Sequence, residues 1–179
     1  MKKLPIIQVG NQQFRLPCTA YADHDVTSKP LKELILQMKY TMRAVHGVGL
    51  AAPQIGVQKQ LFVMRLTPTK FRPHIAAVKP YAVINPQVIT RSAATTQDHE
   101  GCFSVAHAGL FAELVRPQRI QVAYFNEEGL RVTKVLQDLE ARVFLHEYDH
   151  LHGSIFLDHS INTLTYMSAE EYRLMRQNV

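Results

Sequence analysis

Apolar residues recur at intervals of three and four in the segment after Thr27, and this spacing predicts an amphipathic helix. Ser28 stands at the position of a helix N-cap, Pro30 suits the first turn, and Gly47 ends the pattern. One face of this helix should therefore pack against a core. The apolar positions of that face are Leu31, Leu34, Ile35, Met38, Met42 and Val45.

Shorter stretches rich in β-branched and aromatic residues follow and indicate strands. Three of them are bounded by proline, asparagine or threonine-rich turns, at 60–66, 81–84 and 87–90. Two more, at 119–125 and 130–136, flank the sequence Asn-Glu-Glu-Gly. This arrangement predicts an antiparallel hairpin.

A second long helix is predicted from about Gln137 to His152. Its apolar face contains Leu139, Val143, His146 and His150, which repeat at intervals of four, three and four. Two histidines therefore continue the buried stripe of this helix.

Near the C-terminus, Ser168 and Glu171 fit a capping box that opens a short helix through Arg176. The whole pattern predicts an α+β fold. We expect mostly antiparallel strands packed around a central helix, the one that contains His146 and His150. An N-terminal helix and a short C-terminal helix complete the predicted fold.

Composition narrows the class of protein. With 179 residues, 46% hydrophobic and 20% charged, the chain is predicted to form a single domain over residues 1–179 and not to be disordered. The net charge of +5 comes from scattered residues, with no basic run longer than Lys2-Lys3, so we expect no dedicated DNA-binding site. Two cysteines, no visible signal peptide and no run of eighteen apolar residues favour a cytoplasmic protein that does not enter membranes.

The sequence His146-Glu147-Tyr148-Asp149-His150 is an HExxH pattern. On a helix its two histidines project one turn apart, close enough for both imidazoles to bind one metal ion, with the glutamate at the open side of that ion. A catalytic site usually needs a third protein ligand. Asp158 and His159 follow, but not at the spacing of the longer zinc-protease pattern, and Cys102 is the other candidate.

A third segment, Gly-Val-Gly-Leu-Ala-Ala-Pro-Gln at 47–54, precedes Glu-Gly-Cys-Phe-Ser at 100–104 and the HExxH pattern. Together and in this order, the three segments resemble the motifs of the peptide deformylase family: GφGφAAxQ, EGCLS and HExDH, where φ is apolar. The resemblance implies that Cys102, His146 and His150 hold one divalent metal ion, physiologically Fe²⁺, with Ni²⁺, Co²⁺ or Zn²⁺ also accepted. It further implies hydrolysis of the formamide at the N-terminus of newly made polypeptides, with release of formate, and a proton-transfer role for Glu147.

The same resemblance implies roles for residues around the metal. The side chain of Gln54 and the backbone N–H of Phe103 would hold the developing oxyanion. Gly49 and its neighbours would present backbone groups to an extended substrate. Asp149 and Arg116 would pair and support the ligands from outside. Candidates for the pocket of the methionine side chain are Gly47, Val48, Leu139 and Val143.

The chain also departs from the family pattern. Phe103 replaces leucine, Ala106 replaces proline and Leu145 replaces glutamine, and the stretch 107–114 is longer and more apolar than usual. We expect this stretch to be a loop that borders the substrate cleft. His99, His107 and His152 match no ligand position and are interpreted as surface or loop residues.

Three other functions fit parts of the sequence. One is an HExxH metallopeptidase, a second is a structural metal module with Cys18 as a fourth ligand, and a third is a deformylase-like protein that binds nascent chains with little turnover. The expected partners are nascent N-formylmethionyl polypeptides and, by analogy with bacterial relatives, the ribosome near its exit tunnel. The C-terminal helix offers no separate electrostatic argument for that docking, because Arg173 and Arg176 are accompanied by Glu170 and Glu171.

Overall fold

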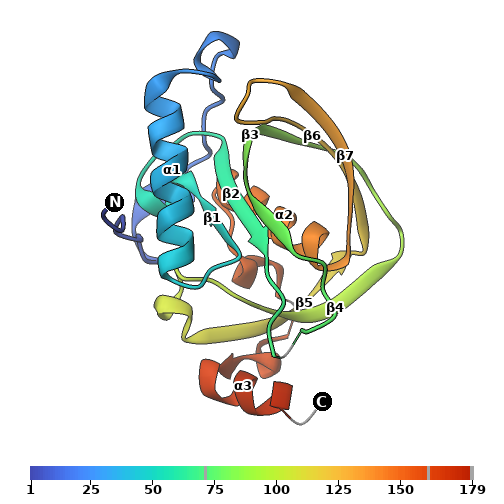
Figure 1. The fold of residues 1–179 in the computed structure, drawn as a ribbon. Coiled ribbons are helices and arrows are strands. Elements are labelled where there is room, and N and C mark those ends of the chain that lie inside the picture. Colours follow the sequence, from blue (N-terminus) through green and yellow to red (C-terminus); the bar gives the residue numbers. More distant parts are fainter. Residues whose placement is uncertain (71, 161, 178–179) are drawn as a thin grey trace.

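A computed structural model describes residues 1–70, 72–160 and 162–177. In this part of the chain, three α-helices accompany two antiparallel sheets, which confirms the predicted α+β class (Figure 1). The helices are α1 (Lys29–Ala44), α2 (Asp138–Leu151) and α3 (Ala169–Gln177). No helix of the described residues is long and apolar enough to cross a membrane.

The larger sheet has five strands, all paired antiparallel with their neighbours. The smaller sheet has three strands, also antiparallel. In spatial order the larger sheet contains β1 (Gly49–Ala51), β2 (Leu61–Leu66), β3 (Val78–Arg91), β6 (Arg119–Phe125) and β7 (Arg131–Gln137), and the smaller one contains β4 (Thr95–Gly101), β5 (Leu110–Pro117) and β8 (Met167–Ser168).

Alternating residues of the larger sheet bury its two faces against different helices. Phe62 and Met64 of β2 belong to a core shared with α2, whereas Leu61 and Val63 belong to a core shared with α1. Helix α2 also contacts β5 of the smaller sheet. Figure 1 accordingly shows α2 enclosed between the two sheets and α1 on the opposite face of β1 and β2.

Most predicted elements are present with small shifts at their ends. Helix α1 has Ser28 as its N-cap residue, although the side chain of Ser28 makes no capping hydrogen bond. The hairpin forms as β6 and β7, and the N–H of Glu171 donates to Ser168 Oγ at 3.2 Å at the start of α3. The two short strands predicted at 81–84 and 87–90 are one strand, β3, with a register shift between Ile84 and Gln87.

The prediction of a long loop at 107–114 is wrong. Residues from Leu110 onward belong to β5, whose inward positions Ala112 and Leu114 are buried. Only a tight turn, Ala106–Ala108, remains irregular, and all three of its residues have left-handed backbone angles with φ from 47° to 64°. The N–H groups of Val105 and Ala108 donate to the carbonyl of Cys102, so these hydrogen bonds fix the backbone at the cysteine.

Candidate active site

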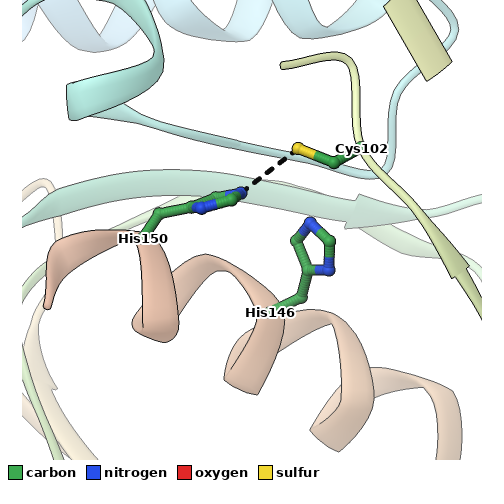
Figure 2. A group of neighbouring side chains, drawn as sticks. All are labelled: Cys102, His146 and His150. Atoms are coloured by element: carbon green, nitrogen blue, oxygen red, sulfur yellow. Dashed lines mark hydrogen bonds between the residues drawn. The ribbon is translucent and has the colours of Figure 1, made fainter. Parts of the chain in front are cut away.

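The three proposed metal ligands come from two distant parts of the chain. Cys102 directly follows β4, while His146 and His150 lie one turn apart on α2. Figure 2 shows the thiol opposite the two rings. Their ligand atoms all lie within 4.8 Å of one another, and Cys102 Sγ is 3.3 Å from His150 Nε2. Metal–nitrogen and metal–sulfur bonds of about 2.0 to 2.3 Å place two donors of one ion at a comparable separation.

Each histidine uses its outer ring nitrogen for a hydrogen bond. His146 Nδ1 lies 2.9 Å from Glu100 Oε2, and His150 Nδ1 lies 3.1 Å from the carbonyl oxygen of Ser154. Because both partners are acceptors, each Nδ1 donates the hydrogen bond, and each Nε2 is left on the side of the ring that faces the cluster. The two rings are therefore oriented as metal binding requires.

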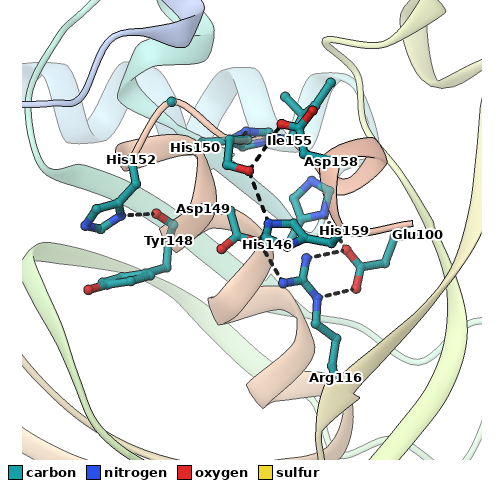
Figure 3. A network of polar contacts seen from close by, with 12 residues as sticks. Glu100, Arg116, His146, Tyr148, Asp149, His150, His152, Ile155, Asp158 and His159 are labelled. Atoms are coloured by element: carbon teal, nitrogen blue, oxygen red, sulfur yellow. Dashed lines mark hydrogen bonds and ion pairs between the residues drawn. The ribbon is translucent and has the colours of Figure 1, made fainter. Parts of the chain in front are cut away.

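Glu100 belongs to a buried charge network, and Figure 3 shows its carboxylate against the guanidinium of Arg116. It accepts from Arg116 Nε and Nη2 at 2.9 and 3.0 Å and from Arg142 Nη1 at 2.8 Å. Burial alone would raise the pKa of Glu100, but the hydrogen bonds from His146 and Arg116 hold it well below its usual range. Arg116 Nη1 also donates to Asp149 Oδ2 at 2.6 Å, so the pair that the resemblance implied does form an ion pair.

Glu147 lines the same cavity as Cys102 and His146, and the residue is only 4% exposed. Among the described residues, its Oε2 atom has no hydrogen-bond partner. Burial raises the pKa of Glu147 to about 7. A buried carboxylate oxygen without a partner is costly unless a ligand or a catalytic proton uses it.

Gly49 provides the space for this carboxylate. A Cβ atom at position 49 would lie 2.2 Å from Glu147 Oε1, far inside van der Waals contact. Gly49 is therefore required for the close approach of Glu147, in addition to any role of Gly49 in substrate binding.

Gln54 lies at the other side of the cysteine, on the short helix Ala52–Ile55. The N–H of Ala51 donates to its Oε1 at 2.7 Å, and this bond directs the amide nitrogen inward. Gln54 Nε2 lies 3.4 Å from Cys102 Sγ and 3.2 Å from Ser104 Oγ. An amide donor is thus fixed beside the candidate metal group.

A cavity of about 320 Å³ opens next to these groups. The proposed pocket residues from the first motif and from α2 line it together with the ligands Cys102 and His146 and the glutamate. Asp149 and Arg116 lie outside it, behind the ligands. The predicted residues that line the cavity are Gly47, Val48, Gly49, Gln54, Cys102, Phe103, Leu139, Val143, His146 and Glu147.

Cys18 lies outside this group. Its thiol is buried beside Gln58 Oε1, at 3.4 Å, and burial raises its pKa to about 11. The group of candidate ligand atoms found among the described residues contains Cys102 and the two histidines of α2. The structural module with Cys18 as a fourth ligand therefore has no support in this geometry.

The sequence analysis missed three residues that shape the site. Glu100 was quoted in a motif but given no role, although it stands two residues before Cys102, where strand alternation puts both on one face. Arg142 lies next to the apolar position Val143 of the helix and is buried against Glu100, a contact that the helical pattern does not predict. The interpretation of His99 as a surface or loop residue is wrong, because His99 is half-buried on β4 and lines the cavity, whereas His107 and His152 are exposed.

Comparison with known proteins decides the family. The family model for polypeptide deformylase matches residues 3–165. The chain belongs to the peptide deformylase family. It is therefore an enzyme of the hydrolase class, and the family's metal dependence agrees with the possible metal-binding group formed by Cys102, His146 and His150.

Relatives match the deformylase chain over most of its length. Peptide deformylase 2 of Nostoc sp. is 35% identical over 171 residues, which cover 95% of this chain and 93% of the relative. The class I type b peptide deformylase of Acinetobacter baumannii, solved with Met-Ala-Ser bound, has a TM-score of 0.83 and 28% identity and covers 88% of this chain and 98% of its own. The peptide deformylase of Thermotoga maritima has a TM-score of 0.78 and 33% identity and covers 90% of this chain and 100% of its own.

Proposed function

We propose that this deformylase hydrolyses the formamide of N-formylmethionyl peptides in a metal-dependent reaction and releases formate. The observation that carries the proposal is the buried Oε2 atom of Glu147, which has no hydrogen-bond partner among the described residues and belongs to a side chain that lines the same cavity as Cys102 and His146. A buried carboxylate oxygen that has no partner among the described residues is available to hold and move a proton of the reaction.

Cys102, His146 and His150 would hold one divalent ion. The fit rests on the converging donor atoms and on the two histidines whose outer nitrogens are already bonded. When bound, the ion supplies Lewis acidity that makes water a nucleophile near neutral pH. The resemblance implies Fe²⁺ physiologically, and two imidazoles with one thiolate also suit Ni²⁺, Co²⁺ or Zn²⁺.

The chain's own groups divide the remaining work. Glu147 accepts the proton of the attacking water and returns it to the departing amine. Gln54 Nε2 and the N–H of Phe103 donate to the oxygen that becomes negative as the carbonyl is attacked, and fixed donors of this kind are worth about 3 to 4 kcal/mol each. The pocket formed by Gly47, Val48, Leu139 and Val143 would receive the methionine side chain.

The relative from Acinetobacter baumannii was solved with a peptide that begins with methionine. Such a peptide is what removal of a formyl group from a formyl-methionyl substrate leaves. We therefore propose nascent N-formylmethionyl polypeptides as the substrates and the cytoplasm as the compartment. Docking at the ribosome stays a prediction from the resemblance, and a single domain over residues 1–179 stays a prediction from length and composition.

The decisive experiment is formate release from formyl-Met-Ala-Ser by the metal-loaded protein. The variant Glu147→Gln keeps the shape of the side chain and removes its basicity, so kcat should fall by a factor of about 10² to 10⁴. Glu33→Gln, an exposed change on α1, is the matched control and should leave kcat unchanged.

Mass spectrometry of the same reactions separates the alternatives. Cleavage of a peptide bond with the formyl group retained would identify a metallopeptidase. Binding of the peptide without formate would identify a deformylase-like binding protein. Either result would overturn the proposed function.

A further inference from the structure

One wall of the active-site cavity is built by residues outside the three motifs. Phe111 of β5, Tyr172 of α3, His99 of β4 and Arg72 all line it. Helix α3 lies beyond residue 165, where the match to the family model ends. The wall is therefore formed partly by the C-terminal segment and partly by β5 and its neighbour β4.

Two aromatic rings form the centre of the wall. The rings of Phe111 and Tyr172 are stacked, with their centroids 4.2 Å apart and their planes 8° apart. The centroid of the His99 ring lies 5.8 Å from that of the Tyr172 ring, and His99 also lines the cavity. Both stacked rings are only half-buried, and both line the cavity, so part of their surface is open to a ligand.

The wall adjoins the candidate metal group. A Cβ atom at Gly101 would lie 2.7 Å from the Phe111 ring, so this ring covers the backbone immediately before Cys102. An aromatic side chain is thus placed against the strand that leads to the thiol.

The position of Tyr172 is fixed before any substrate arrives. Strand β8 pairs with β5, with Phe111 opposite Met167, and the N–H of Ala169 donates to the carbonyl of Gly109 at 3.1 Å. Arg72 Nη2 contacts Tyr172 Oη at 3.5 Å. Arg72 Nη2 donates to Asp98 Oδ2 at 2.6 Å, and this ion pair compensates the charge of Arg72. The wall therefore presents aromatic surface to a ligand, with little net charge from this pair.

The lining residues of the cavity come from different elements. The candidates for the methionine pocket lie just before β1 and on α2, whereas Phe111 and Tyr172 lie on the smaller sheet and α3. In an extended peptide, successive side chains point to opposite sides. A substrate that places its first side chain among Val48, Leu139 and Val143 therefore directs its second side chain away from them.

We propose that Phe111 and Tyr172 form a specificity-determining wall that favours an aromatic side chain at the residue directly after the formylated one. This inference rests on the proposed function. An aromatic side chain of the substrate would add a third ring in edge or offset contact with the stacked pair. Such contacts stabilise a complex beyond the burial of apolar area, and they are expected to increase kcat/KM about 3- to 10-fold.

The test compares formyl-Met-X-Ser peptides in which X is phenylalanine, leucine or alanine. The native enzyme should favour phenylalanine over alanine about 3- to 10-fold in kcat/KM, mainly through a lower KM, with leucine between them. Tyr172→Ala should reduce this ratio to below about 2-fold. Tyr172→Phe should keep the ratio, because the ring and its stacking remain.

Two further variants control for folding and position. Leu174→Ala removes an exposed apolar side chain from the same helix, outside the cavity, and should leave the ratio unchanged. Tyr172→Leu keeps apolar bulk on α3 and removes the ring, so loss of the ratio in this variant, with native circular dichroism, supports the wall even where the alanine variant unfolds.

Several results would overturn the inference. They are an unchanged ratio in Tyr172→Leu, an equal loss of kcat/KM for all three peptides, no preference in the native enzyme, or a preference that appears only in formyl-Met-Ala-X peptides. Absence of formate from every peptide would instead overturn the proposed function. Formate release without dependence on X would overturn the wall alone.

Discussion

The absence of a side chain at Gly49 leaves room for the carboxylate of Glu147, the candidate general base. The strand of Gly49 is fixed by pairing with β2, where Gly49 lies opposite Met64, so the backbone cannot easily retreat. In Gly49→Ala the new methyl group would overlap Glu147, and the carboxylate must move. We expect kcat for formate release to fall at least about 10²-fold, because the base is displaced from its reaction geometry.

Stability and metal content separate this effect from general damage. Overpacking of this kind costs about 1 to 3 kcal/mol of unfolding free energy, which should leave Gly49→Ala folded at 25 °C. Its metal content should equal that of the native enzyme, because the three ligands are untouched. Native-like kcat in a folded, metal-loaded Gly49→Ala would contradict the assigned role of the glycine.

Cys18 gives the enzyme a pH dependence of stability that is unrelated to catalysis. Burial raises its pKa to about 11 in the folded protein, whereas an unfolded cysteine ionises near 8.5. Between these values the unfolded chain has lost the proton that the folded chain keeps. The contribution of Cys18 to the free energy of unfolding is therefore fully present below pH 8. Between the two pKa values it falls by about 1.4 kcal/mol for each unit by which the pH rises.

Cys18→Ala should remove this contribution. Urea denaturation of the metal-loaded enzyme at pH 8, 9 and 10 should show a shallower loss of stability in the variant than in the native protein. Tyr81, whose pKa burial also raises, contributes equally to both proteins and cancels in the comparison. Parallel curves for the two proteins would show that Cys18 does not titrate in this way.

At the scale of elements, periodic apolar patterns explain what could be predicted from sequence. Helices α1 and α2 and the β6–β7 hairpin bury apolar side chains at regular intervals, and all were predicted to within a few residues. Strand β4 has the sequence Thr-Thr-Gln-Asp-His-Glu-Gly, which contains no apolar side chain. Its buried position is occupied by Glu100, whose charge is compensated by partners distant in the sequence, and no local pattern reveals such pairing.

The same reasoning applies to the site. The ligands could be proposed because a motif reports residue type and spacing, both of which are local. The orientation of His146 by Glu100 and the aromatic wall on α3 depend on contacts between segments far apart in the chain. Those contacts arise from packing of the smaller sheet against α2 and α3, which the sequence pattern did not predict.

Arg142 connects α2 to the smaller sheet. It donates to Glu100 Oε1 and to the carbonyl of Thr96, both at 2.8 Å, and to the carbonyl of Leu114 at 3.2 Å. It thus binds β4 and β5 at once. Arg142→Met should reduce the free energy of unfolding by about 3 to 5 kcal/mol, because buried acceptors and part of a buried charge lose their partner.

Denaturant unfolding of the metal-loaded proteins measures this effect. Arg43→Met, an exposed change in the last turn of α1, is the control and should alter stability by less than about 0.5 kcal/mol. If Arg142→Met is as stable as this control, the arginine does not hold the helix to the sheet.

At the scale of the whole molecule, the candidate metal group joins two parts of the fold. Cys102 follows β4 of the smaller sheet, and the histidines lie on α2, which packs against the larger sheet. A ligand that binds only the folded state stabilises it by RT ln(1 + [L]/Kd), about 2.7 kcal/mol at a hundredfold excess over Kd. For a chain of 179 residues this corresponds to a rise in Tm of roughly 5 to 10 °C.

We therefore expect a chelator to lower Tm by that amount and added Zn²⁺, Ni²⁺, Co²⁺ or anaerobic Fe²⁺ to restore it. Cys102→Ser should lose most of the shift, because a weakly basic hydroxyl replaces the thiolate. Cys18→Ala should keep it, since Cys18 lies outside the ligand group. The opposite pattern, with the shift lost in Cys18→Ala and kept in Cys102→Ser, would place the metal elsewhere and remove the basis of the proposed chemistry.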